Sequence, residues 1–259
     1  MNSQELKSIV ESLSSVMEEA GKKSIEIFDK GLKIKMKEDN SPVTNGDLEV
    51  NNILTTKIKN LTPNIPIISE ETVDLNLKNT LKTYWLIDPI DGTREYISGK
   101  DEYTLNAGLI INKLPALGII GVPKKERIFF SYGKGNSFLL EKGIKKNLDC
   151  KKKTSVNEIF ALTNHINPPE IILKKLKDCG MTSFKKLSSS YKYCVIANGE
   201  YDLYADKVQA MEWDDAAGHA IAEHAGAIVT DLEGNNFSYG RENYKNPTIL
   251  IRRSINLND

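Results

Sequence analysis

Residues 85–96, WLIDPIDGTREY, place a strongly apolar run directly before two aspartates, a proline and a glycine. An apolar run of this kind is typical of a buried strand, whereas Asp-Pro and Asp-Gly pairs are typical of turns. We therefore expect Asp88 and Asp91 at the end of a strand whose start is buried. The segment is either a solvent-exposed turn or a site that needs carboxylates at that end.

The charge composition argues against two classes of function. Lysine plus arginine and aspartate plus glutamate both number 35, so the formal net charge is +0. This balance disfavours a nucleic-acid scaffold and a polybasic membrane binder. The three cysteines are too few and too scattered for a disulfide framework, which favours a reducing compartment. The N-terminus has no apolar signal core, and no window approaches the ~18 apolar residues of a membrane span. We expect a cytoplasmic protein without a nucleic-acid partner.

The first part of the chain mixes helices and strands. Apolar residues spaced four and three apart from Leu6 to Ala20 form the stripe of an amphipathic helix, for which Ser3 is a candidate cap. Further along, we expect a half-buried strand at 32–36, a helix at 45–61, buried strands at 65–69 and 84–88, and strands at 103–111, 115–122, 127–132 and 137–142.

From about Cys150 the pattern changes to alternating strands and helices. We expect strands at 159–163, 201–205, 227–230 and 248–251, and helices at 169–178, 191–197 and 214–224. The fold class is therefore α/β, with an α+β domain at 1–149 and an α/β domain at 150–259. The lysine-rich segment 141–153 is interpreted as a solvated loop and linker between them.

The acidic residues at the ends of these elements predict a metal site. The candidates in the first part are Glu70, Asp88 and Asp91, and a fourth, Asp214, begins a helix far downstream. Two carboxylates about 4 Å apart repel by about 4 kcal/mol at an effective dielectric of 20, so four would not stay together without cations. Oxygen ligands without histidine or cysteine select Mg²⁺. A site with two Mg²⁺ ions is typical of displacement at phosphorus.

The residues around this acidic cluster can bind a phosphate and activate a water molecule. Gly92 allows a sharp turn, and residues 93–99 can start a helix whose free N–H groups face an anion. The Thr93 hydroxyl needs a carboxylate behind it to activate water, and Asp47 is the candidate. Taken one at a time, DPIDGT (88–93) can be a solvent turn, Glu70-Glu71 is typical of a surface pair, and WDDAAG (213–218) is typical of a helix cap. Their joint presence favours a site.

Haloacid-dehalogenase-like phosphatases also use two aspartates before Gly-Thr, but two residues apart, and here Pro89 occupies the nucleophile position. The chain instead resembles the inositol-monophosphatase-like phosphatases, which are lithium-sensitive and magnesium-dependent. Four segments carry this resemblance, in the right order and at the right separations: SPVTNGD (41–47), SEE (69–71), WLIDPIDGT (85–93) and WDDAAGHAIAEHAGA (213–227). The resemblance implies a layered αβαβα sandwich of the inositol monophosphatase and fructose-1,6-bisphosphatase type, with metals held between its halves.

The same resemblance implies the site residues, matched position by position. The ligands of two or three Mg²⁺ ions would be Glu70, Asp88, the carbonyl of Ile90, Asp91 and Asp214. Thr93 and Asp47 would orient and deprotonate the attacking water, and the backbone N–H groups of Gly92 and Thr93 would hold the phosphate. Glu71 and Asp215 match no ligand and are expected behind the site or at the surface.

Residues 91–110 and 188–204 resemble one branch of this family, the 3′(2′),5′-bisphosphate nucleotidases (CysQ), which convert adenosine 3′,5′-bisphosphate to AMP. The positions that match nucleotide contacts of that branch are His165, Ser189 and Lys192. A serine-rich helix start with a lysine forms a second anion site, useful only to a substrate with a second negative group. The alternatives are a loop histidine, an ordinary helix cap and a solvated lysine.

Two positions bear on the choice of substrate. Inositol-type members carry a carboxylate seven residues before Asp214, where this chain has Lys207, which disfavours inositol phosphate. The nucleotidase branch has an arginine near this place, where this chain has Asp206. An inositol-1-phosphate or fructose-1,6-bisphosphate phosphatase and a non-catalytic metal- or nucleotide-binding relative remain the alternatives. The expected partner is a small phosphate ester. Whether the protein forms a homodimer is left open.

Overall fold

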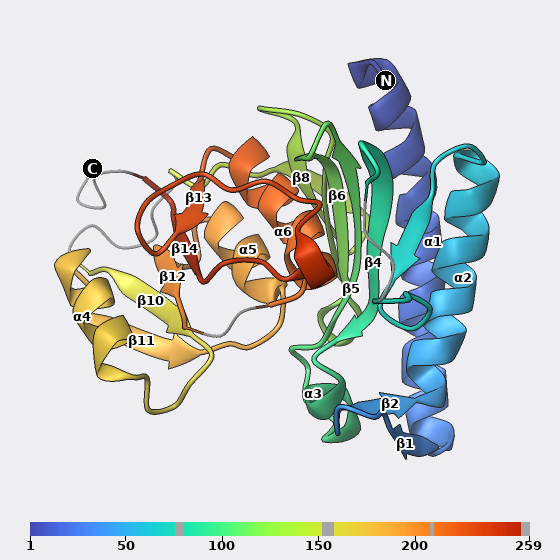
Figure 1. Ribbon diagram of the computed structural model, residues 1–259, viewed down its shortest axis with the longest axis horizontal. Coiled ribbons are helices and arrows are strands. Elements are labelled where there is room, and N and C mark those ends of the chain that lie inside the picture. The colour runs from blue at the N-terminus through green and yellow to red at the C-terminus, as the bar shows by residue number, and fades with distance from the viewer. Residues whose placement is uncertain (76–79, 152–157, 208–209, 255–259) are drawn as a thin grey trace.

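The computed structural model describes residues 1–75, 80–151, 158–207 and 210–254. These residues form five layers in the order helix, sheet, helix, sheet, helix (Figure 1). The α/β sandwich expected from the sequence is therefore confirmed. Among the described residues, no helix is both long and apolar enough to cross a membrane.

The helices and strands are as follows. The helices are α1 (Ser3–Lys30), α2 (Asn45–Leu61), α3 (Thr93–Ile97), α4 (Glu170–Asp178), α5 (Tyr191–Ala197) and α6 (Glu212–His224), with 3₁₀ turns at Pro123–Lys125 and Glu242–Tyr244. The strands are β1 (Ile34–Met36), β2 (Pro42–Thr44), β3 (Ile67–Ser69), β4 (Thr83–Asp91), β5 (Thr104–Ile111), β6 (Leu114–Val122), β7 (Arg127–Ser131), β8 (Ser137–Glu141), β9 (Ile144–Asn147), β10 (Phe160–Thr163), β11 (Ser183–Lys186), β12 (Leu203–Ala205), β13 (Ile228–Asp231) and β14 (Ile249–Arg252).

Two large sheets carry the fold. The seven-stranded sheet runs β3-β4-β5-β6-β7-β8-β9 and is antiparallel except for the parallel pair β3–β4. The five-stranded sheet runs β11-β10-β12-β14-β13, with β10 parallel to both of its neighbours. β1 and β2 form a separate two-stranded sheet. Strands joined by short turns are antiparallel here, as expected for hairpins.

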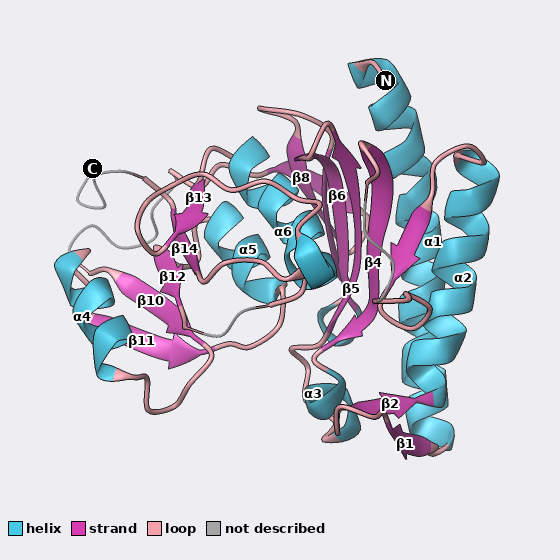
Figure 2. Ribbon diagram, viewed as in Figure 1, coloured by secondary structure: helices cyan, strands magenta, loops and turns pink. Residues whose placement is uncertain are grey.

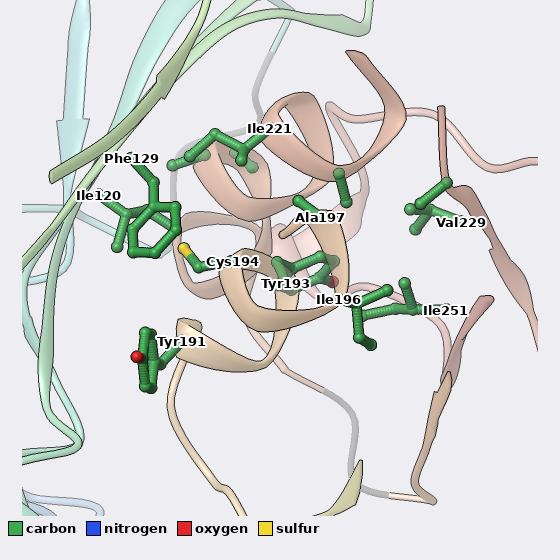
Figure 3. Packing of buried hydrophobic residues seen from close by; sticks show 14 of the residues in the cluster. Ile120, Phe129, Tyr191, Tyr193, Cys194, Ile196, Ala197, Ile221, Val229 and Ile251 are labelled. Atoms are coloured by element: carbon green, nitrogen blue, oxygen red, sulfur yellow. The ribbon is translucent and has the colours of Figure 1, made fainter. Parts of the chain in front are cut away.

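Three apolar clusters hold the layers together. α1 and α2 cover the outer face of the seven-stranded sheet. One apolar cluster lies between these helices and the sheet, and it includes the buried stripe of α1 from Leu6 to Ala20. α5 and α6 lie between the two sheets (Figure 2), where Tyr193 and Cys194 of α5 are fully buried (Figure 3). α4 covers the far face of the five-stranded sheet through Ile172 and Leu176. Each helix is thus held mainly by its apolar face.

α6 packs directly onto the seven-stranded sheet because the sheet presents glycines there. A β-carbon added at Gly118 would lie 2.2 Å from the carbonyl oxygen of Ala217, and one at Gly108 would lie 2.8 Å from the β-carbon of Ala216. Neither distance is tolerable, so a side chain at either strand position would push the helix away. This close approach places the first turn of α6 beside the ends of β4 and β5.

Several local expectations need correction. The cap of α1 is Asn2, which forms a capping box with Glu5, and Ser3 lies inside the helix. The strand expected to be half-buried at 32–36 is the exposed strand β1. Residues 144–147 of the expected linker form the edge strand β9, because they pair with β8 after a tight turn at 142–143. Residues 152–153 of that segment lie outside the described residues.

The proposed domain boundary falls between the two sheets, since β9 ends at Asn147 and β10 begins at Phe160. One apolar cluster nevertheless contains residues from both sheets, among them Leu86 of β4 and Ile251 of β14. Whether the chain forms two units divided at 149 and 150 stays a prediction.

Candidate active site

The end of β4 explains why two aspartates three positions apart can work together. Asp88 pairs with Asn106 of β5 and Asp91 pairs with Thr104, so three steps along β4 match two along β5. In a regular strand, residues three apart point to opposite faces. The extra residue forms a bulge, which returns both aspartates to one face.

Asp88 is, with Asp214, one of two strongly perturbed acids of the cluster. Its side chain is 2% exposed, and its Oδ1 has no hydrogen-bond partner among the described residues. Burial raises the pKa of Asp88 well above its usual range, and the negative charges of Glu70, Asp91, Asp214 and Asp47 raise it further. These five acids therefore share one electrostatic neighbourhood.

Glu70 follows β3 and is held at the same sheet edge, because its N–H donates to the carbonyl of Ile87 at 3.1 Å. The carboxylate of Glu70 forms an ion pair with a lysine side chain. Lys37, in the loop between β1 and β2, places its Nζ 2.8 Å from Oε1 of Glu70 and 2.9 Å from Oε1 of Glu71. Although burial opposes it, the charge and hydrogen bonds of these two glutamates raise the pKa of Lys37 above its usual range.

Asp91 is held by neutral donors instead. The backbone N–H and the hydroxyl of Ser190 lie 2.5 and 2.6 Å from Oδ2 of Asp91. The Thr104 hydroxyl lies 3.4 Å from the same oxygen. These bonds fix the carboxylate without neutralising it.

Asp214 occupies the third position of α6. Its Oδ2 accepts the N–H of Met211 at 2.9 Å, so the residue caps its own helix. Burial raises the pKa of Asp214 well above its usual range, as do the charges of Asp91, Asp215 and Glu70. The helix-cap interpretation and the metal-ligand interpretation are therefore compatible, since the cap uses one oxygen.

Asp47 and Thr93 meet across the site. Gly92, at a φ of 88° in the left-handed region that favours glycine, turns the chain from β4 into α3. The Thr93 hydroxyl then lies 3.2 Å from Oδ1 of Asp47 and 3.2 Å from the carbonyl oxygen of Ile90. The other oxygen of Asp47 accepts the N–H and hydroxyl of Thr44 at 2.8 and 2.6 Å. Burial, the largest effect, raises the pKa of Asp47, while these hydrogen bonds lower it.

The described residues contain no ready-formed group of three or more His, Cys, Asp or Glu side chains around a single point. Glu70 turns toward Lys37, and Asp91 toward Ser190. The acids nevertheless fit cations by their chemistry, because a buried carboxylate oxygen of Asp88 faces no donor and is surrounded by like charges. The metal-ligand assignments stay predictions.

A cavity of about 120 Å³ adjoins these acids, between the sheets. Asp91 and Asp214 line one side and Lys192 another. Lys192 is 4% exposed, with its Nζ 5.4 and 5.2 Å from the ring centres of Tyr193 and Tyr204. The structure thus brings a buried cation to the acidic cluster, contrary to the alternative of a solvated lysine.

Asp215, which also lines this cavity, is fully buried and accepts hydrogen bonds from Tyr193 and Asn246, each at 2.9 Å. Burial raises its pKa, although the charge of Lys192 opposes that shift. Asp215 therefore lies behind the site and balances the charge of Lys192.

Two predicted nucleotide contacts do not belong to the cavity lining as far as the described residues show. The Ser189 hydroxyl donates to the carbonyl of Glu102. His165 lies at the half-exposed rim, with its Nε2 3.3 Å from Oδ1 of Asp206. Lys207, next to Asp206, is exposed. Their roles toward a substrate stay predictions.

Sequence reasoning missed three residues of this site. Lys37 continues the lysine alternation of 33–37, but nothing local showed that its side chain turns toward Glu70. Ser190 belongs to a run of three serines, of which the sequence singled out Ser189. Asn106, whose Nδ2 lies 3.0 Å from the hydroxyl oxygen of Ser190, is a polar residue inside an apolar strand. A buried asparagine in such a strand is a usable signal.

Comparison with known proteins gives a consistent result. The model of the inositol monophosphatase family matches residues 5–254. The chain is 30% identical over 247 residues to the 3′(2′),5′-bisphosphate nucleotidase CysQ of Salmonella typhimurium, covering 94% of this chain and 99% of that protein. It is 31% identical over 236 residues to the protein of the same name in Escherichia coli K12, covering 90% and 94%.

Solved structures agree. CysQ from Bacteroides thetaiotaomicron, described as a bacterial member of the inositol monophosphatase family, superposes with a TM-score of 0.74 at 25% identity, covering 92% of this chain and 94% of that one. An IMPase/NADP phosphatase complexed with Mg²⁺ and phosphate superposes at 0.79, and its 16% identity shows the shared fold alone; the coverage is 96% and 92%. The chain belongs to the inositol monophosphatase family.

Proposed function

We propose that this protein is a Mg²⁺-dependent phosphomonoesterase that hydrolyses adenosine 3′,5′-bisphosphate to AMP and phosphate. Relatives at 30–31% identity over nine-tenths or more of the chain are named 3′(2′),5′-bisphosphate nucleotidases, which supports this substrate. The single observation that carries the proposal is Asp88. Its buried oxygen has no hydrogen-bond partner among the described residues and lies among other acids, so the ionised carboxylate is stable there only opposite cations.

In this proposal Glu70, Asp88, Asp91, Asp214 and the carbonyl of Ile90 would hold two or three Mg²⁺ ions. When bound, such ions supply positive charge to the phosphoryl oxygens and to the departing ester oxygen. Lys37 contacts only Oε1 of Glu70, so Oε2 of Glu70 can face a cation while the ion pair persists.

The chain's own residues handle the proton and the phosphate. Thr93 Oγ1 accepts a hydrogen bond from the attacking water while donating to Asp47, so a proton lost by the water can pass through Thr93 to Asp47. Burial raises the pKa of Asp47, which makes it a better base than an exposed aspartate. The N–H groups of Gly92 and Thr93 are the proposed donors to the phosphate.

The second phosphate of the substrate is assigned to the side of the cavity that holds Lys192. A buried lysine surrounded by tyrosine rings attracts an anion strongly, because little water screens it. The Ser189 hydroxyl would reach the same group only after leaving the carbonyl of Glu102. His165, whose side chain is 40% exposed, is the proposed contact to the nucleoside.

A phosphate-release panel tests the proposal. Adenosine 3′,5′-bisphosphate, inositol 1-phosphate and fructose 1,6-bisphosphate are each assayed with Mg²⁺ and with EDTA. We expect Mg²⁺-dependent release from the first, with a kcat/KM at least about tenfold above the others, and inhibition by Li⁺. Preference for either of the other esters would assign that substrate instead. Thermal stabilisation by Mg²⁺ without any turnover would indicate a non-catalytic relative.

We further propose a cytoplasmic location and leave a homodimer as one assembly to test. Cell fractionation checks the first, and light scattering of the purified protein checks the second.

A further inference from the structure

Ser190 connects acids from distant parts of the chain. It precedes α5 and is fully buried. Its N–H and hydroxyl both contact Oδ2 of Asp91 at the end of β4, and its hydroxyl also contacts the backbone carbonyl oxygen of Asp214 in α6. One side chain therefore touches the carboxylate of Asp91 and the backbone of Asp214, where β4 and α6 meet.

The hydroxyl of Ser190 is held in place from behind. Nδ2 of Asn106 lies 3.0 Å from its oxygen, and Asn106 is itself fully buried on β5. The amide nitrogen can only donate, so the hydroxyl oxygen of Ser190 accepts from Asn106 and its single proton is left for Asp91 or for the Asp214 carbonyl. The Asp91 carboxylate attracts that proton more strongly, since it is charged.

Because the donors of Ser190 are neutral, they affect the Asp91 carboxylate differently from a lysine side chain. The N–H and hydroxyl of Ser190 fix the direction of the Asp91 carboxylate and leave its negative charge available. Lys37, by contrast, neutralises Glu70 directly. A carboxylate that is oriented in advance loses less freedom when a cation binds, so its affinity for the cation is higher.

We propose that Ser190 is a positioning residue, which fixes the direction of the Asp91 carboxylate beside the backbone of Asp214 and thereby tunes the affinity of this site for a divalent cation. This inference rests on the proposed Mg²⁺ dependence, and it concerns cation binding rather than the choice of substrate. Asn106 acts through Ser190 and completes the arrangement.

The test measures Mg²⁺ binding by isothermal titration calorimetry of the full-length, metal-stripped protein, without substrate. Ser190→Ala removes the hydroxyl and keeps the N–H. We expect its Kd for Mg²⁺ to rise about tenfold or more, the usual size for one charge-assisted hydrogen bond. The matched control is Ser137→Ala, which also removes a buried hydroxyl, one that lies 3.0 Å from the Ile221 carbonyl oxygen near the end of α6 and makes no hydrogen bond to a site acid among the described residues. Its Kd should stay within twofold of wild type.

A second variant tests the role of Ser190 even if the Ser190→Ala protein does not fold. Asn106→Ala should raise the Kd for Mg²⁺ about threefold or more in the wild-type background and have no further effect in the Ser190→Ala background, because its influence passes through Ser190. Circular dichroism and thermal unfolding in EDTA establish that each variant is folded. If Ser190→Ala does not fold, the Asn106→Ala value decides alone.

The outcomes separate the two proposals. A folded Ser190→Ala protein that binds Mg²⁺ within twofold of wild type overturns the role of Ser190. A wild-type protein that binds Mg²⁺ but releases no phosphate from adenosine 3′,5′-bisphosphate overturns the proposed function and leaves the positioning role to be decided by the Kd values. A wild-type protein that binds no divalent cation overturns both.

Discussion

The hydroxyl oxygen of Thr93 lies 3.2 Å from Oδ1 of Asp47, joining the start of α3 to the start of α2. The other oxygen of Asp47 is held by Thr44, so the carboxylate cannot rotate away. A hydroxyl backed by a fixed, buried carboxylate is suited to taking a proton from water.

Thr93→Ala should therefore impair the chemical step. We expect kcat for adenosine 3′,5′-bisphosphate to fall about 10²- to 10⁴-fold, the usual range for general base catalysis, with KM changed less than about threefold. Steady-state phosphate release measures both constants. Thr93→Ser keeps the hydroxyl and should retain most of the activity. A loss confined to KM would show that Thr93 only binds substrate.

Asp91→Asn should separate metal binding from folding. Removing one negative charge relieves the repulsion that raises the pKa values of Asp88 and Asp214, so Tm in EDTA should equal or exceed that of wild type. Phosphate release should be abolished and Mg²⁺ should no longer raise Tm. Asp178→Asn, an exposed position at the end of α4, is the control and should behave as wild type. Wild-type turnover in Asp91→Asn would contradict the ligand role.

Much of this fold follows from local patterns. The helix at 45–61 and the helix at 191–197 were predicted with the observed bounds, because apolar spacing and flanking residues define both. The burial of β1 was misjudged, although a strand was predicted there, and the lysine-rich edge strand β9 was interpreted as a loop. Each is stabilised by backbone pairing with a neighbour rather than by an apolar face, and the sequence does not show which partner a strand pairs with.

In the candidate active site, too, some features follow from local sequence motifs and others depend on tertiary contacts. Sequence motifs pointed to Asp47 and Thr93, and the structure brings them into contact. Motifs could not reveal that Lys37 neutralises Glu70 or that Ser190 holds Asp91, because those contacts depend on loop paths and on the packing of α5 between the sheets. Single-residue chemistry is readable from sequence, whereas the partner of each charge is decided by tertiary structure.

Two buried histidines should each contribute a loss of stability as the pH falls, opposite in sign to the effect of the buried carboxyl groups with raised pKa values. Burial lowers the pKa of His219 from 6.5 to about 3 and that of His224 from 6.5 to about 4. Below pH 6.5 the unfolded chain takes up protons that the folded chain excludes. The stabilisation by neutral rings is therefore complete above pH 6.5 and is lost as the pH falls toward 4, by up to about 1.4 kcal/mol per pH unit for each histidine.

The Tm of His219→Gln should shift upward relative to that of wild type as the pH falls from 6.5 to 4, because one of the two histidines no longer titrates. The matched control is Tyr239→Phe. It removes the hydroxyl 3.1 Å from Nδ1 of His219 but keeps the ring, so it should lower Tm by a similar amount at every pH. Scanning calorimetry at half-unit pH steps measures the slopes. Equal slopes for His219→Gln and wild type would show that His219 does not contribute.

Lys192→Gln should lower affinity for substrates that carry a second phosphate. The buried ammonium of Lys192 lines the cavity beside Asp91 and Asp214, and its removal leaves that phosphate without a desolvated cation. We expect KM for adenosine 3′,5′-bisphosphate to rise about tenfold or more, with the KM for adenosine 3′-monophosphate changed less than about threefold. Lys207→Gln is the control, because Lys207 is exposed. If KM for the bisphosphate rises in Lys207→Gln but not in Lys192→Gln, the second phosphate binds at Lys207 instead. If Lys192→Gln raises KM equally for both substrates, Lys192 has a structural role as the counter-ion of Asp215.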